Sequence, residues 1–266
     1  MTLQKWVYDR ATHGYPTFSV DDVRETGMYP SEQIAKNEFC RLCSKKTIAN
    51  VYRGFYVIIP VQYALRGSVP ATYYVDQLMG YLDKPYYVCM LSAAEMLGAA
   101  HQRPQRFSVM TTFPKSRVVS NRNAIDWFCR ERLPEESLII RNTETGTIRI
   151  SNPLLTAADL VQYQQHVGGL SRVATVLEEL AEQIDIKRQF APLATFVKKV
   201  VWQRLGYLLE NVVGEKALAD ELYEQLRKLS GAIMYTPLST SAENVAAERD
   251  TRWKIDINIQ IETDDL

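Results

Sequence analysis

This sequence has few cysteines, glycines and prolines, and it lacks long apolar runs. Its 266 residues include four cysteines, 12 glycines and 11 prolines, and no apolar run approaches the ~18 residues of a membrane span. So few cysteines suit a reducing cytoplasm and argue against a secreted disulfide framework. The first residues lack the apolar stretch of a signal peptide, so we expect neither a leader nor membrane association.

Catalytic and metal-binding motifs are also missing. There is no Gly-rich phosphate loop, nucleophile elbow or paired-His motif, and the three histidines, His13, His101 and His166, are isolated. The Cys40-x-x-Cys43 spacing suits metal ligands, but no second Cys/His pair completes a four-ligand site. We therefore predict no metal, no cofactor and no catalytic residue, although chemistry by Glu or Lys stays open as an alternative. Five acidic residues are predicted to be solvated on helix surfaces: Asp159, Glu178, Glu179, Glu182 and Asp185.

Charge is balanced overall but uneven along the chain. Lys plus Arg and Asp plus Glu each number 31, yet residues 1–66 carry a net charge of +3, residues 101–132 carry +5 and residues 133–266 carry −6. A local basic field can attract a polyanion even in a neutral protein. The alternative is an ordinary solvated face.

The first 66 residues predict a winged helix-turn-helix domain. Helical patterns cover residues 3–10, 20–25 and 31–44, and Ser19 is suited to cap the second of them. Two β-rich runs, 47–52 and 55–59, then flank Arg53-Gly54 as a hairpin. Helix, helix, polar-faced helix and hairpin follow one another in the order of that fold.

Residues 67–266 predict a larger mixed domain, which makes the chain α+β. Helical patterns cover 72–82 and 86–98, and strands are expected at 107–113, 117–119, 124–128, 138–141 and 147–150. Helices then dominate, at 156–163, 171–183, 193–213 and 215–229, before a loop at 236–250. From Trp253 to Ile261 apolar and polar residues alternate, which indicates a half-buried strand. We expect this strand to join the sheet of residues 107–150 and close the domain.

The polar face of the third helix is suited to reading DNA. Gln33, Asn37 and Arg41 recur every four residues on one face, and amide and guanidinium groups read base edges in the major groove. Nearby cations would contact phosphates, and Arg53 lies at the tip of the wing. The predicted DNA-binding residues are Ser31, Gln33, Lys36, Asn37, Arg41, Lys45, Lys46 and Arg53. A polar helix face that contacts a protein partner is the alternative.

A second basic stretch interleaves cations with aromatic residues. It could extend a DNA-facing surface or meet an acidic partner, or it could be the outer face of a sheet. Its cations are Arg103, Arg106, Lys115, Arg117, Arg122, Arg130 and Arg132.

Several segments resemble the AbiEi family of bacterial antitoxins. They are the hairpin of residues 51–60, the segment 86–98, the passage 146–160 and the closing Arg252-Trp253 pair. The resemblance implies a two-domain antitoxin of a type IV toxin–antitoxin, or abortive infection, pair. Its winged helix would bind inverted repeats in operator DNA and repress its own operon. Its C-terminal domain would counter a nucleotidyltransferase-like toxin, without a stable complex. A winged-helix interaction module, or a transcriptional regulator with no antitoxin role, remains the alternative.

Overall fold

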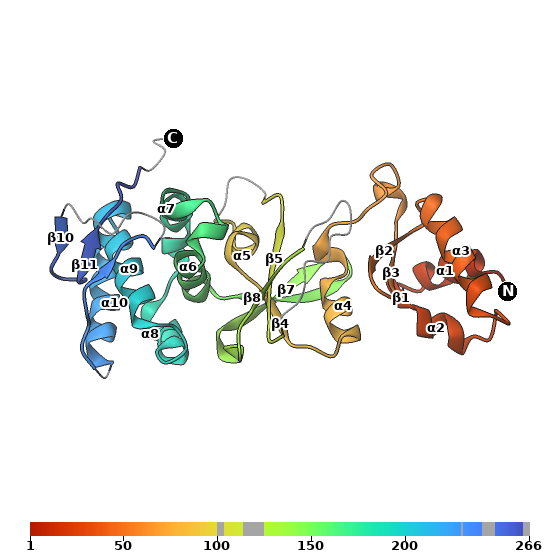
Figure 1. The fold of residues 1–266 in the computed structure, drawn as a ribbon, viewed down its shortest axis with the longest axis horizontal. Helices are drawn as coiled ribbons and strands as arrows, with labels where there is room; N and C mark the ends of the chain where they lie inside the picture. Colours follow the sequence, from red (N-terminus) through yellow and green to blue (C-terminus); the bar gives the residue numbers. More distant parts are fainter. Residues whose placement is uncertain (100–103, 114–124, 230, 241–247, 263–266) are drawn as a thin grey trace. The chain divides into compact units, whose positions relative to one another are not determined.

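The computed structural model describes residues 1–99, 104–113, 125–229, 231–240 and 248–262 (Figure 1). Helices and strands are mixed along the chain, which confirms the α+β class. The chain divides into two compact units: unit 1 comprises Met1–Tyr87, Val109–Leu133 and Ile140–Arg149, and unit 2 the remaining segments. Within the described residues, no helix combines the length and apolar character that crossing a membrane requires.

Unit 1 begins with a winged helix-turn-helix module (Figure 1). Its elements are α1 (Leu3–Thr12), β1 (Thr17–Ser19), α2 (Val20–Glu25), α3 (Glu32–Ser44), β2 (Ile48–Tyr52) and β3 (Phe55–Ile58). The three strands form an antiparallel sheet in the order β1-β3-β2. Strand β1 was not predicted, because three residues show no periodicity and its pairing partner lies far along the chain.

The module is held by helix caps and an aromatic core. Ser19 and Asp22 form a reciprocal capping box: the Ser19 hydroxyl accepts from the Asp22 N–H at 3.0 Å, and the Asp22 carboxylate accepts from the Ser19 N–H at 2.7 Å. Phe18 is 1% exposed and stacks on Tyr56, with ring centroids 5.5 Å apart. Phe39 of α3 stacks on the same tyrosine at 4.8 Å. These contacts fix α3 against the sheet.

A mixed five-stranded sheet has the order β6-β5-β4-β8-β7. Its strands are β4 (Tyr86–Val88), β5 (Phe107–Thr111), β6 (Ile125–Cys129), β7 (Leu138–Thr143) and β8 (Gly146–Ser151), and β4 runs parallel to β8. The helix predicted over 86–98 is therefore wrong at its start, since residues 86–88 are a strand and α5 spans only Met90–Met96. Tyr, Tyr and Val favour strands, and all three are buried. The strand predicted at 117–119 lies outside the described residues.

Shorter elements link the module to this sheet. They are η1 (Val61–Tyr63), η2 (Ala71–Tyr73) and α4 (Val75–Tyr81), with η3 (Glu135–Ser137) before β7. The Thr145 hydroxyl donates to the carbonyl of Tyr73 at 2.6 Å, and Gln77 donates to the carbonyl of Thr145 at 3.1 Å. The turn between β7 and β8 is thereby attached to the helical segment of the same unit.

Unit 2 is mainly helical. Its later helices are α6 (Pro153–Gln162), η4 (Gln164–His166), α7 (Gly169–Leu180), η5 (Ala181–Gln183), α8 (Ile186–Gln189), η6 (Ala191–Leu193), α9 (Lys199–Leu208), η7 (Leu209–Val213) and α10 (Lys216–Lys228). The helix predicted over 193–213 begins at Lys199 instead, because Lys198 has extended backbone angles. It continues into η7, a π-helical turn that is followed by its C-cap, Gly214.

The prediction of a solvated Asp159 is wrong. Helix α6 is buried along Pro153–Val161, and Asp159 is 0% exposed. The helix packs against α5, α7 and α9, so neighbours cover every face. A charge pattern cannot reveal burial of this kind, because it depends on elements distant in sequence.

The C-terminal strand forms a sheet of its own, which corrects the expected pairing with the region 107–150. Strand β11 (Ile255–Ile257) lies between β10 (Glu248–Asp250) and β9 (Thr236–Pro237). The strand is shorter than its alternation predicts because Lys254 has a positive φ of 53°, which interrupts extended backbone before it. After it, the Asn258 side chain bonds both the N–H and the carbonyl of Ser239, at 3.0 and 2.9 Å.

Candidate nucleic-acid interface

The amphipathic pattern of α3 separates a buried face from an exposed polar face. Phe39 and Leu42 are 4% and 0% exposed and belong to the core of the module. Gln33, Asn37 and Arg41 are all exposed. This arrangement follows from the 3.6-residue period of the helix, which places residues four apart above one another. The sequence therefore sets which groups α3 offers to solvent.

Two local contacts hold the exposed polar side chains. The Gln33 amide donates to the Asn37 side-chain oxygen at 3.1 Å, and the Arg41 guanidinium donates to Glu38 at 2.7 Å. The Arg41–Glu38 pair is exposed, and such pairs contribute only ~0–1 kcal/mol. Arg41 can therefore exchange Glu38 for another anion at small cost.

Two of the predicted DNA-binding residues, Ser31 and Lys45, are also the caps of helix α3. The Ser31 hydroxyl accepts from the backbone N–H of Ile34 at 3.5 Å, and Lys45 is the C-cap. Lys46 follows with a positive φ of 56°, while its N–H donates to the Cys43 carbonyl at 2.9 Å.

The four cations predicted to contact phosphates are exposed, but they differ in their local contacts. Lys36, Lys45, Lys46 and Arg53 are all exposed. The Lys46 ammonium donates to the carbonyl of Leu65 at 3.3 Å. Arg53 lies in the two-residue turn between β2 and β3, and the next carbonyl, that of Gly54, accepts from Val20 at 2.8 Å. The tip of the wing is thereby anchored to the start of α2.

Arg24 was missed by sequence reasoning, although it lies beside α3. It lines a 510 Å³ cavity together with Ser31, Gln33 and Lys36. Its guanidinium donates to Asp21 at 2.7 Å and to Glu32 at 2.5 Å. The hydrogen bond that Arg24 donates to Asp21, together with the charge of Glu32, raises the pKa of Arg24 above its ordinary value. The spacing of Asp21 and Arg24 along α2 was the available signal.

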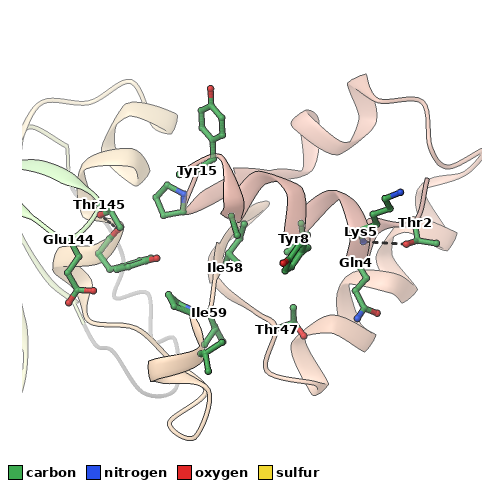
Figure 2. Close-up of a pocket in the computed structure, with 17 residues that line it drawn as sticks. Thr2, Gln4, Lys5, Tyr8, Tyr15, Thr47, Ile58, Ile59, Glu144 and Thr145 are labelled. Carbon is green, nitrogen blue, oxygen red and sulfur yellow. Dashed lines mark hydrogen bonds between the residues drawn. The ribbon is translucent and has the colours of Figure 1, made fainter.

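A larger cavity of 790 Å³ lies elsewhere in unit 1 (Figure 2). Residues of α1 line it, among them Lys5 and the exposed Tyr8, and so do Ile58, Ile59 and Thr145. None of the eight predicted DNA-binding residues lines this cavity. It is therefore separate from the exposed face of α3.

The second basic stretch is only partly described. Arg103, Lys115, Arg117 and Arg122 lie outside the described residues, as does His101. Arg106 and Arg130 are half-buried and Arg132 is exposed. In the described part of the chain, no three His, Cys, Asp or Glu residues group closely enough to hold a metal ion.

Comparison with known proteins identifies the region that follows the module. Residues 86–211 match the family model of the AbiEi antitoxin C-terminal domain. This region belongs to the AbiEi antitoxin family. The AbiEi match begins at β4, includes α6 to α9 and ends within η7. The match supports an antitoxin role, and an antitoxin of this family implies a cognate toxin.

Comparisons with curated proteins and with solved structures give different results. No curated protein matches the chain. A crystal structure of the RV2827C protein from Mycobacterium tuberculosis is similar, with a TM-score of 0.66, 15% identity, and coverage of 95% of this chain and 89% of that one. At this identity the similarity shows the fold alone. The exposed face of α3 lies outside the AbiEi match, so its role is inferred from its own chemistry.

Proposed function

We propose that this AbiEi antitoxin binds operator DNA through its winged helix and represses its own operon. The observation that carries the proposal is the exposed row of Gln33, Asn37 and Arg41 on α3, on a different face from the buried Phe39 and Leu42. Amide and guanidinium groups can each make two hydrogen bonds to a base edge. A rigid helix presents them at fixed spacing.

In this proposal the eight residues divide into two roles. Gln33, Asn37 and Arg41 read base edges in the major groove. The others bind the phosphate backbone and set position and register, and for Ser31 the positive end of the α3 dipole assists. The phosphate-binding residues are Ser31, Lys36, Lys45, Lys46 and Arg53. The net positive charge of residues 36–66 supports this assignment.

The toxin in this proposal is a nucleotidyltransferase-like enzyme, which the AbiEi domain counters without forming a stable complex. The AbiEi match supports an antitoxin role, and the resemblance to the family supplies the class of toxin. Binding an operator and countering this toxin both require a bacterial cytoplasm, which is therefore the proposed location.

Salt dependence of duplex binding tests the DNA-binding proposal. The full chain is titrated in a gel-shift assay against its own promoter and against a scrambled duplex of equal length, at low and at physiological salt. A DNA reader prefers the promoter and loses affinity steeply as salt rises. Absence of duplex binding at both salts would overturn the proposal in favour of a protein-interaction module.

A growth assay tests the class of toxin. A nucleotidyltransferase-like toxin encoded beside this gene is expressed with and without the full chain. We expect growth arrest by the toxin alone and recovery with the chain. A chain that binds the promoter but gives no recovery would indicate a regulator without activity against this class of toxin.

A further inference from the structure

Two thiols lie one helical turn apart on α3. Cys40 is exposed, Cys43 is half-buried, and both are free. Neither has a role in the proposed reading of DNA, but Arg41 lies between them in sequence. The pair is therefore a chemically reactive group inside the helix that carries the DNA-binding face.

Helix geometry brings the Cα atoms of the two cysteines into the range of a disulfide, but it leaves their Cβ atoms too far apart. Residues i and i+3 of an α-helix have Cα atoms about 5 Å apart, inside the range that disulfides tolerate. Their Cβ atoms are about 5–6 Å apart, whereas a disulfide requires roughly 3.5–4.5 Å. Closing the bond therefore demands a local distortion of the helix.

The place of the pair in α3 makes that distortion possible. The helix ends at Ser44, directly after Cys43, and its last turn is held by bonds from Lys45 and Lys46 to the carbonyls of Arg41 and Cys43. The terminal turn of a helix opens more readily than its interior. Distortion falls on this turn, while Phe39 stays packed in the core.

The surroundings distinguish the two sulfurs. Burial raises the pKa of the Cys43 thiol above its ordinary value. The neighbouring Cys40 raises this pKa further, while a hydrogen bond with the backbone of Asn50 lowers it by less than burial raises it. Cys43 therefore holds less of the reactive thiolate. The exposed Cys40 meets an oxidant first, and Cys43 follows.

We propose that Cys40 and Cys43 form an oxidisable dithiol whose reversible disulfide distorts the last turn of α3. With hydrogen peroxide as oxidant, the Cys40 thiolate attacks one peroxide oxygen and the O–O bond breaks, which yields a sulfenic acid and a hydroxide. The hydroxide takes up the proton that the Cys40 thiol released and leaves as water. The Cys43 sulfur then forms the S–S bond and displaces the sulfenic hydroxyl, which takes the proton of the Cys43 thiol and leaves as a second water. The two thiols lose two electrons in total and the peroxide gains two. A dithiol reductant reverses the reaction.

The consequence for DNA rests on the proposed function. Distortion between positions 40 and 43 moves Arg41, so the oxidised chain should bind its promoter about fivefold more weakly or worse, the lower end of what loss of a bidentate Arg costs. Formation of the Cys40–Cys43 disulfide does not depend on DNA binding. The two parts are therefore measured separately.

The modification is tested in the full chain carrying Cys129→Ser, which removes the other exposed thiol. Hydrogen peroxide is the probe, and intact mass and peptide mapping are the readouts. We expect a loss of two hydrogens within the peptide that contains both cysteines, restored by dithiothreitol. Matched Cys40→Ser and Cys43→Ser variants should not show it. Disulfide-linked dimers or irreversible oxygen adducts, with no intramolecular bond, would overturn the proposal.

Amide hydrogen exchange and gel shift then follow the consequence. Faster exchange over residues 41–46 in the oxidised chain supports distortion of the turn, and unchanged exchange overturns it. If the reduced chain binds no duplex while the disulfide forms and exchange rises, the proposed function fails and the dithiol stands. If the reduced and oxidised chains bind the promoter equally, the coupling to DNA is overturned.

Discussion

The indole of Trp253 lies directly on the backbone of Gly206 in α9. A methyl group at position 206 would be 2.1 Å from Cη2 and Cζ3 of Trp253, far inside van der Waals contact. Trp253 is 0% exposed, and its indole N–H donates to the Glu210 carboxylate at 2.6 Å. Arg252 donates to the same carboxylate at 2.7 Å and also contacts Asp220. The Arg252-Trp253 pair thus helps to hold the C-terminal sheet on α9, together with Gln203, which donates to the Trp253 carbonyl at 2.8 Å.

Replacing Gly206 with alanine should therefore destabilise the protein. The indole must shift to admit the methyl group, and overpacking of this kind costs roughly 1–3 kcal/mol. The matched control is Gly80→Ala in α4, where a methyl group meets nothing within 4 Å. That change should stabilise by roughly 0.5–1 kcal/mol, because alanine favours helix. Thermal unfolding of the Gly206→Ala and Gly80→Ala variants measures both effects. Equal unfolding midpoints would contradict the packing of Trp253 on Gly206.

Tyr86 should make stability depend on alkaline pH. Burial raises the pKa of its phenol, and the charge of Asp76, to which the phenol donates at 2.8 Å, raises it further. The folded state therefore retains a proton that the unfolded chain loses near pH 10. Below that pH the contribution to stability is complete, and it falls as pH rises above ~10.

Denaturant unfolding between pH 7 and 11 measures this effect. Tyr86→Phe loses a hydrogen bond to a charged group, roughly 1.5–3 kcal/mol at neutral pH, but its stability should decline less steeply above ~10. Some decline remains, because burial also raises the pKa of Tyr56 and of Tyr74. A variant with the same slope as the parent chain would show that Tyr86 does not retain its proton.

Lys46 allows backbone strain and charge to be separated. Its φ of 56° favours glycine, and the bond from the Thr47 N–H to the Leu42 carbonyl, at 3.0 Å, completes a Schellman cap. Lys46→Gly should be more stable than Lys46→Ala by about 1 kcal/mol, since only alanine keeps the strain. Both variants lose the same charge, so their promoter affinities should fall equally. Parent-like affinity in both would remove Lys46 from the phosphate contacts.

Local pattern predicted the winged helix because its signals lie close together in sequence. The face of α3 follows from spacing alone, and so does the hairpin around Arg53. What the sequence did not reveal depends on distant partners. Strand β4 exists because β8 pairs with it, Asp159 is buried because helices surround it, and Gly206 is required because Trp253 lies on it.

The candidate site shows the same division. Periodicity identified which side chains of α3 are exposed, but not the bonds that occupy them. Glu38 holds Arg41, and the Leu65 carbonyl holds Lys46. Arg24 was missed because one of its two carboxylate partners, Glu32, belongs to the next helix.

The Arg41–Glu38 pair gives the sharpest prediction for DNA binding. If Arg41 is bidentate to a guanine, Arg41→Ala should weaken promoter binding by ~1–3 kcal/mol and relax specificity at one position. Glu38→Gln should act in the opposite direction, because it releases the guanidinium and removes a negative charge beside the proposed DNA-binding face. Lys45→Ala should weaken binding to every duplex and make the salt slope shallower by about one. Gel-shift titrations of the three variants against promoter and scrambled duplex check these effects. An Arg41→Ala chain with unchanged promoter affinity would remove Arg41 from base reading and leave the polar face of α3 free for another partner.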